Sequence, residues 1–120
     1  GNDPKAQAIT LIGEVQDKNA IIVDDEVDTA GTLVEAVELI RRNGARKIFT
    51  VCTHATLSSP AVERLRAAPI EEFICTDTVP IPLEKRLPNF KILSVAPLLA
   101  ETIIRTHDGR SVGEYLHDTQ

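Results

Sequence analysis

The sequence of 120 residues has few aromatic and no methionine side chains: Trp and Met are absent, and only three Phe and one Tyr occur. A core must therefore be built from Val, Ile, Leu and Ala, a mixture typical of layered α/β packing. The apolar fraction of 42% is sufficient for such a core, which argues against a disordered chain. The length fits a single domain.

Basic residues are in deficit, with 13 Lys and Arg against 18 Asp and Glu and a formal net charge of -5. This balance argues against general affinity for nucleic acid or for an anionic membrane, since both require a basic surface. It does not exclude phosphate, which helix N-termini or a divalent cation can hold. No apolar run approaches membrane-spanning length, and residues 1–5 lack a signal-peptide pattern. We therefore expect a soluble, cytoplasmic protein that binds neither nucleic acid nor membrane.

Cysteine is scarce as well. Cys52 and Cys75 each lie in an apolar run, and neither belongs to a CxxC pair that would indicate a zinc site. We expect two buried free thiols in a reducing compartment, in preference to a disulfide.

Predicted strands and helices alternate along the chain, which indicates an α/β fold with a mostly parallel sheet flanked by helices. The predicted strands cover residues 20–23, 47–52, 72–75 and 90–95, and the predicted helices cover residues 32–43, 60–67 and 97–107. The first of these strands is a continuous apolar run, which predicts burial on both faces. Ser59 and Pro60 are expected to begin the second helix, residues 78–82 to be irregular, and residues 112–116 to form a short turn.

The start of the chain is less regular. Residues 8–13 could form a short strand, but it begins abruptly, as though an earlier element were missing. We therefore divide the chain into a lead-in that looks truncated, residues 1–12, and one domain, residues 13–120.

Residues 24–32 carry the strongest chemical signal, because four acidic residues fall within five positions at the end of a buried strand. Placing such a cluster of carboxylates at a buried strand end costs free energy unless a cation or a ligand with several hydroxyl groups contacts it. The backbone amides of residues 29–32 could surround a phosphate, and Gly31 would allow close approach because it has no Cβ. The carboxylates could accept hydrogen bonds from a sugar diol or hold a hydrated Mg²⁺, so a pentose phosphate is the predicted ligand. The alternative is a solvated turn in which Asp28 or Thr29 only caps the helix.

The sequence VDDEVDTAGT at residues 23–32 resembles the ribose-5-phosphate loop of the ribose-phosphate pyrophosphokinases, or phosphoribosyl pyrophosphate synthetases. A related loop occurs in type I phosphoribosyltransferases, so this motif alone indicates only the superfamily. Residues 53–61 (THATLSSPA), 76–78 (TDT) and 91–101 (KILSVAPLLAE) resemble the synthetases in the same order. The similarity extends from about residue 13 to residue 116.

The resemblance implies a type I phosphoribosyltransferase-like fold, as in the C-terminal half of the two-domain synthetases. Members of that family transfer a pyrophosphoryl group from ATP to the C1 hydroxyl of ribose 5-phosphate, with Mg²⁺, and yield phosphoribosyl pyrophosphate for nucleotide biosynthesis. By that resemblance Asp24 and Asp25 would meet the ribose hydroxyls and are the candidate metal ligands. The 5-phosphate would be held by Asp28, Thr29, Ala30, Gly31 and Thr32. A homo-oligomer is expected.

The chain departs from a complete synthetase in one respect. Family members are much longer, and their nucleotide-binding residues, pyrophosphate loop and Lys/Arg-containing catalytic loop lie upstream; none is recognisable before Gly13. We therefore expect the C-terminal part of an enzyme, with no catalytic residues of its own and no activity in isolation. The alternatives are a non-catalytic, synthetase-associated regulatory protein and a type I phosphoribosyltransferase, which the downstream segments disfavour.

Three further residues have two interpretations each. Thr53 and His54 are expected to be a polar strand end rather than support for the sugar site. Ser111 matches the first serine of a regulatory site in many family members, but Gly113 replaces the second, so this role is weakly supported.

Overall fold

The computed structural model describes residue 11 and residues 13–118 of the chain. Most of the predicted lead-in, and of the short strand expected at residues 8–13, lies outside the described residues. Across the part of the chain that the structure describes, no helix combines the length and apolar character that crossing a bilayer requires.

The centre of the molecule is a four-stranded parallel sheet in the order β1-β2-β3-β4. The strands are β1 (Ala20–Val27), β2 (Ile48–Ala55), β3 (Glu72–Thr76) and β4 (Phe90–Leu93). Each strand pairs with the next strand in the sequence, so all carboxyl ends meet at one edge of the sheet. The predicted α/β class and the parallel arrangement are confirmed.

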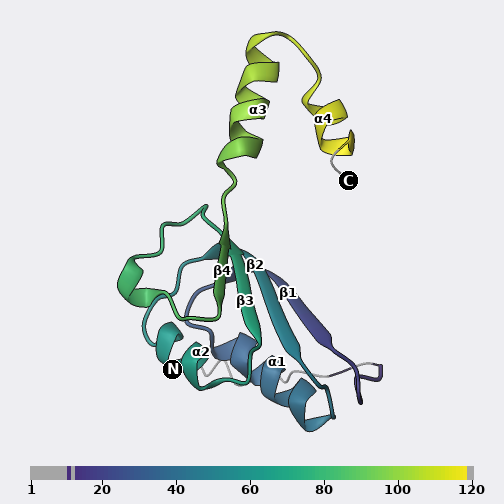
Figure 1. Ribbon diagram of the computed structural model, residues 1–120, viewed down its shortest axis with the longest axis vertical. Helices are drawn as coiled ribbons and strands as arrows, with labels where there is room; N and C mark the ends of the chain where they lie inside the picture. Colours follow the sequence, from purple (N-terminus) through teal and green to yellow (C-terminus); the bar gives the residue numbers. More distant parts are fainter. Residues whose placement is uncertain (1–10, 12, 119–120) are drawn as a thin grey trace, which may run out of the picture.

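Two helices, α1 (Gly31–Arg42) and α2 (Ala61–Ala67), pack on one face of this sheet (Figure 1). Leu33 and Val37 of α1 recur at helical spacing and are buried, as the sequence predicts. The helix ends before Gly44, whose φ of +94° suits a residue without a Cβ. The core between the helices and the sheet consists of Val27, Ala30, Leu33, Val37, Ile48, Cys52, Ala55, Leu57, Ala61, Leu65, Ile70, Phe73, Cys75 and Ile81.

Several element boundaries differ from those predicted. β1 continues beyond residue 23 through the acidic residues to Val27, and β2 continues through Thr53 and His54 to Ala55. Backbone pairing does not depend on side-chain polarity, and the ladder joins Asp24 to Cys52 and Glu26 to His54. Conversely, β4 ends at Leu93, two residues early.

The ends of the shorter helices differ as well. No side chain in the described ranges caps α2, so Ser59 does not act as its cap, and Pro60 takes the N-cap position. Residues 112–116 form part of a helix, α4 (Val112–Asp118), and not only a turn.

The second face of the sheet also differs from expectation. The first strand was predicted to be buried on both faces, but Ile21 and Val23 on β1 are 65% and 75% exposed. Both residues point away from α1, because side chains alternate along a strand and Ile22 packs against the core. No described helix covers this face, which continues to the exposed Leu93 on β4.

The last two helices form an arm that extends past the carboxyl ends of the strands (Figure 1). It consists of α3 (Ala96–His107) and α4, and a 3₁₀ helix, η2 (Leu83–Lys85), lies in the connection before β4. The radius of gyration is 17.2 Å, whereas a compact domain of this length has about 14 Å. The arm therefore projects from the sheet and does not pack on it.

Candidate functional site

A hollow of about 240 Å³ lies at the carboxyl end of β1, where ligands collect in open parallel sheets. It is lined by Asp24, Glu26, Val27, Asp28, Thr29, Ala30, Gly31, Thr32 and Leu33. Six of the seven residues predicted to hold a sugar phosphate are in this lining; Asp25 is not. The volume suits a small polar ligand better than a drug-sized one, for which pockets of about 300 Å³ or more are usual.

The backbone of the loop has the conformation of an anion-binding turn. Val27 is buried, and its carbonyl oxygen accepts hydrogen bonds from the amides of Thr56 and Leu57, at 3.0 and 3.2 Å. These bonds fix the end of β1 against the segment after β2. Ala30 then adopts the left-handed conformation (φ 66°, ψ 8°) directly before the helical Gly31. Successive amides in such a left-handed and right-handed pair converge on a concave site for anions.

The start of α1 leaves its first amides available. No side chain of the described residues caps this helix, and the first helical bond runs from the amide of Val34 to the carbonyl of Ala30. The amides of the first turn therefore have no intrahelical acceptor. The alternative in which Asp28 or Thr29 merely caps the helix does not agree with this geometry.

The carboxylates before the loop differ in their relation to the hollow. Asp24 and Glu26 line it, whereas Asp25 does not. The amide of Asp25 donates to Oδ1 of Asp24 at 2.8 Å. Sequence reasoning did not select Glu26, which lies two residues after Asp24 on β1.

Among the described residues no group of three or more His, Cys, Asp or Glu side chains could hold a metal ion by itself. Asp24 and Glu26 nevertheless place two acidic residues in the lining of the hollow. This fits a hydrated Mg²⁺, which is commonly bound through one or two carboxylates together with substrate phosphates. The donor set therefore fits Mg²⁺ in the presence of a phosphorylated ligand.

The neighbouring strand ends carry a network of hydroxyl groups and an imidazole. The hydroxyls of Thr76 and Thr78 donate to the carbonyl of Thr53, at 2.7 and 3.1 Å, and Nδ1 of His54 lies 2.8 Å from Oγ1 of Thr78. The network joins β2 to the segment after β3. These contacts agree with the interpretation of Thr53 and His54 as a polar strand end.

Among the described residues one cationic side chain contacts the loop, and no sequence pattern indicated this contact. Nη1 of Arg64, on α2, donates to the carbonyl oxygen of Thr29 at 3.1 Å. The same nitrogen lies 3.0 Å from the position that a Cβ on Gly31 would occupy. The missing side chain at Gly31 therefore leaves room for a guanidinium group.

The two cysteines are buried free thiols, as predicted. Cys52 on β2 lies opposite Cys75 on β3 in the strand register, and both belong to the face that carries α1 and α2. Burial, the adjacent Cys75 thiol and the Asp24 carboxylate raise the pKa of Cys52 from 9.0 to about 12. Burial also raises the pKa of Cys75, and Arg86 partly opposes this effect. Both thiols are therefore protonated at neutral pH.

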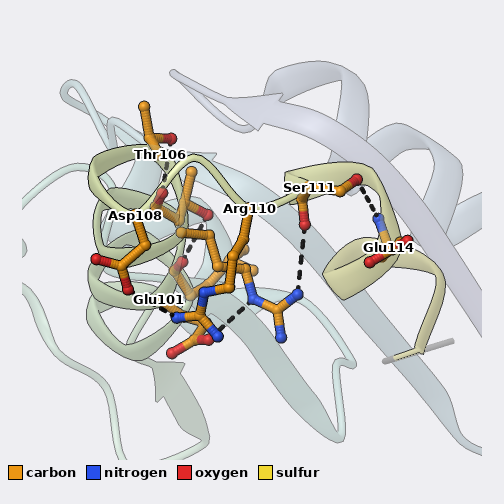
Figure 2. A network of polar contacts seen from close by, with 9 residues as sticks. Glu101, Thr106, Asp108, Arg110, Ser111 and Glu114 are labelled. Carbon is orange, nitrogen blue, oxygen red and sulfur yellow. Dashed lines mark hydrogen bonds and ion pairs between the residues drawn. The ribbon is translucent and has the colours of Figure 1, made fainter.

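Ser111 makes hydrogen bonds within the arm that α3 and α4 form. Figure 2 shows its hydroxyl accepting a hydrogen bond from the amide of Glu114, at 3.2 Å, at the start of α4. The spacing Ser-x-x-Glu is that of a capping box. Arg105 of α3 donates through Nη1 to the Ser111 carbonyl at 3.3 Å and through Nε to Glu101 at 2.9 Å. Ser111 therefore stabilises the arm and is not part of the hollow on β1.

The fold and the hollow together define an α/β domain with a concave loop between the first strand of a parallel sheet and its following helix. The family model described as "Phosphoribosyl synthetase-associated domain" matches residues 2–117, so the chain belongs to this family. The resemblance to the ribose-phosphate pyrophosphokinases is thereby confirmed.

Individual relatives agree with this assignment. The chain is 50% identical over 109 residues to a ribose-phosphate pyrophosphokinase of Caldanaerobacter subterraneus, covering 91% of the chain and 34% of the relative. It is 49% identical to the chloroplastic ribose-phosphate pyrophosphokinase 1 of Arabidopsis thaliana, covering 89% and 27%. The crystal structure of phosphoribosylpyrophosphate synthetase from Mycobacterium smegmatis superposes with a TM-score of 0.80 at 43% identity, covering 82% of this chain and 33% of that one. The chain thus spans about a third of the length of these relatives.

Proposed function

We propose that this chain is the ribose-5-phosphate-binding, C-terminal part of a ribose-phosphate pyrophosphokinase. The observation that carries the proposal is the hollow on β1, which gathers Asp24 and residues 28–32 around convergent backbone amides. Family membership supports the same assignment.

In this proposal the 5-phosphate lies against the amides of residues 30–32, and the hydroxyls of Thr29 and Thr32 add donors. Asp24 accepts hydrogen bonds from the ribose hydroxyls, and Asp28 flanks the phosphate. Asp25 has this role by resemblance alone, since it does not line the hollow. Mg²⁺, bound by Asp24 and the substrate, would neutralise charge on the phosphates during transfer.

The complete reaction would transfer pyrophosphate from ATP to the C1 hydroxyl of ribose 5-phosphate and give phosphoribosyl pyrophosphate. Such catalysis rests on positioning and on cationic groups that neutralise the phosphates. Because the described residues line the hollow with carboxylates and with no Lys or Arg, we expect the 120-residue chain to bind ribose 5-phosphate without producing phosphoribosyl pyrophosphate. We place the protein in the cytoplasm and expect it to be a homo-oligomer. A regulatory protein of this family would retain the same sugar-phosphate binding without catalysis.

Titration of the chain with ribose 5-phosphate, followed by NMR, tests the binding proposal. We expect the amide resonances of residues 29–32 to shift on binding. Asp24→Asn should weaken the binding of ribose 5-phosphate about tenfold, because a sugar diol loses a charged acceptor worth about 1 to 3 kcal/mol. The same substitution should leave the affinity for inorganic phosphate unchanged or slightly higher.

Glu35→Gln is the matched control, since this carboxylate is exposed on α1 and lies outside the hollow. It should not alter the affinity for ribose 5-phosphate. If wild-type resonances do not move at millimolar ribose 5-phosphate, or if Asp24→Asn and Glu35→Gln behave alike, the assignment of the hollow is wrong. Asp25→Asn measured alongside tests the role that rests on resemblance.

A further inference from the structure

Arg64 lies 35 residues after Thr29 in the sequence and is the cationic residue that contacts the loop in the described structure. It belongs to α2, a short helix on the same face of the sheet as α1. Two separate observations join it to the loop: the 3.1 Å hydrogen bond from Nη1 to the Thr29 carbonyl, and the 3.0 Å approach of Nη1 to the missing Cβ of Gly31.

The hydrogen bond acts on the peptide that begins the anion-binding turn. In a trans peptide the C=O and N–H groups point in opposite directions. Holding the Thr29 carbonyl toward α2 therefore turns the Ala30 amide away from α2 and favours the left-handed conformation of Ala30. This conformation costs energy for a residue with a Cβ, so a neighbour must stabilise it.

The charge of Arg64 has a second effect. Asp24, Glu26 and Asp28 line the hollow, and their carboxylates repel a phosphate dianion. Within the described part of the chain no Lys or Arg lines the hollow, so the guanidinium beside the Thr29 carbonyl is the closest compensating charge that the described contacts provide. It forms one hydrogen bond to the described residues and has further N–H donors.

We propose that Arg64 is a positioning residue for the phosphate-binding loop: it holds the Thr29–Ala30 peptide and opposes the acidic charge of the hollow. The proposal rests on the function proposed above and adds a residue that the motif does not contain. It also gives a reason for glycine at position 31. A Cβ there would press on the guanidinium at 3.0 Å and displace it from Thr29.

Ligand titrations of the 120-residue chain test the proposal, with inorganic phosphate and ribose 5-phosphate as probes. Arg64→Ala should weaken both ligands about tenfold, the effect expected for a lost hydrogen bond to a charged group. Arg64→Lys should restore part of the affinity through its charge. Arg66→Ala, two residues along the same helix and without a contact to the loop, should bind as wild type. Equal affinities in wild type and Arg64→Ala would overturn the proposal.

A double-mutant cycle separates the contact from a general loss of structure. Gly31→Ala alone should weaken phosphate binding, and in the Arg64→Ala background it should cost clearly less, because the guanidinium it displaces is absent. Additive effects would contradict the contact. The melting temperature of Arg64→Ala should fall by only about 4 to 8 °C relative to Arg66→Ala, because one hydrogen bond worth about 1 kcal/mol is lost. An Arg64→Ala chain that is unfolded at the temperature of the titrations would indicate a purely structural role and overturn the proposal.

One readout is independent of the proposed function. In the ligand-free chain, the HN–Hα coupling and amide shift of Ala30 report its left-handed conformation, and Arg64→Ala should change both. Unchanged values would refute the positioning role even if ribose 5-phosphate binds. Changed values together with no binding by wild type would refute the proposed function and retain the positioning role.

Discussion

At the scale of single residues, the environment of Cys52 makes a clear chemical prediction. Its thiol is buried, and burial, Cys75 and Asp24 raise its pKa from 9.0 to about 12. Only the thiolate reacts with alkylating agents, and the raised pKa keeps the thiol protonated until the pH is far above neutrality. We expect no labelling of Cys52 by iodoacetamide at pH 8 in the native chain, and full labelling in guanidinium, as measured by mass spectrometry. Labelling of the native Cys75→Ala variant at the rate of a free cysteine would contradict the buried placement.

The residues of the hollow show what sequence reasoning can and cannot predict. Asp28 to Thr32 are consecutive, so their joint placement follows from the motif itself. Asp24 and Asp25 are adjacent in sequence, but only Asp24 lines the hollow, which the motif alone does not indicate. Arg64 could not be predicted, since its contact with Thr29 depends on how α2 packs beside α1. The binding residues that are neighbours in the sequence could be predicted, whereas the contact between the distant residues Arg64 and Thr29 could not.

At the scale of elements, the spacing of apolar residues and the turn residues predicted where the helices and strands lie. The ends of the strands, however, depend on backbone pairing with the neighbouring strand. The ladder between β1 and β2 continues through polar residues such as Glu26 and His54, because these residues pair through their backbones. The burial of both faces of β1 was predicted wrongly, because an apolar run indicates a strand but does not show which faces the neighbouring elements cover. Ile21 and Val23 are exposed because the described helices pack on the other face.

The junction between β4 and α3 depends on Asp77. Its Oδ1 accepts a hydrogen bond from the amide of Val95 at 2.8 Å, and its own amide donates to the Leu93 carbonyl at 3.0 Å. The hydrogen bond from Val95, with a smaller contribution from Ser94, lowers the pKa of Asp77 below the ordinary 3.8. This interaction is therefore complete above pH 3.8 and is lost as the pH falls through the lowered value.

We therefore expect the amide shift of Val95 to be constant from pH 7 to about pH 4 and to change only at lower pH. Asp77→Asn keeps an acceptor oxygen without a titrating group, so its Val95 shift should not depend on pH in this range. Asp77→Ala should increase hydrogen exchange at the start of α3. A Val95 transition at or above pH 4 in wild type would contradict the hydrogen bond.

At the scale of the whole molecule, the uncovered sheet face predicts association. Parallel sheets are usually covered on both faces, yet Ile21 and Val23 are 65% and 75% exposed, and Leu93 adds to the same face. The arm adds Ile103, which is 68% exposed, on α3. Exposed apolar surface that is large enough to form a patch marks sites of protein contact. We expect the chain to self-associate, most simply as a two-fold dimer, the commonest homo-oligomer.

Light scattering over a dilution series, with binding of an apolar dye, measures this association. Val23→Thr preserves the β-branched shape and adds a hydroxyl, so it should shift the dimer midpoint to higher concentration and reduce dye binding without unfolding the chain. Leu83→Thr is the matched control, because Leu83 is 77% exposed on η2 and does not belong to the sheet face. Equal shifts in both variants would place the association elsewhere. A monomer at every concentration, with no dye bound, would mean that the exposed apolar face of β1 does not drive contact between copies of the chain.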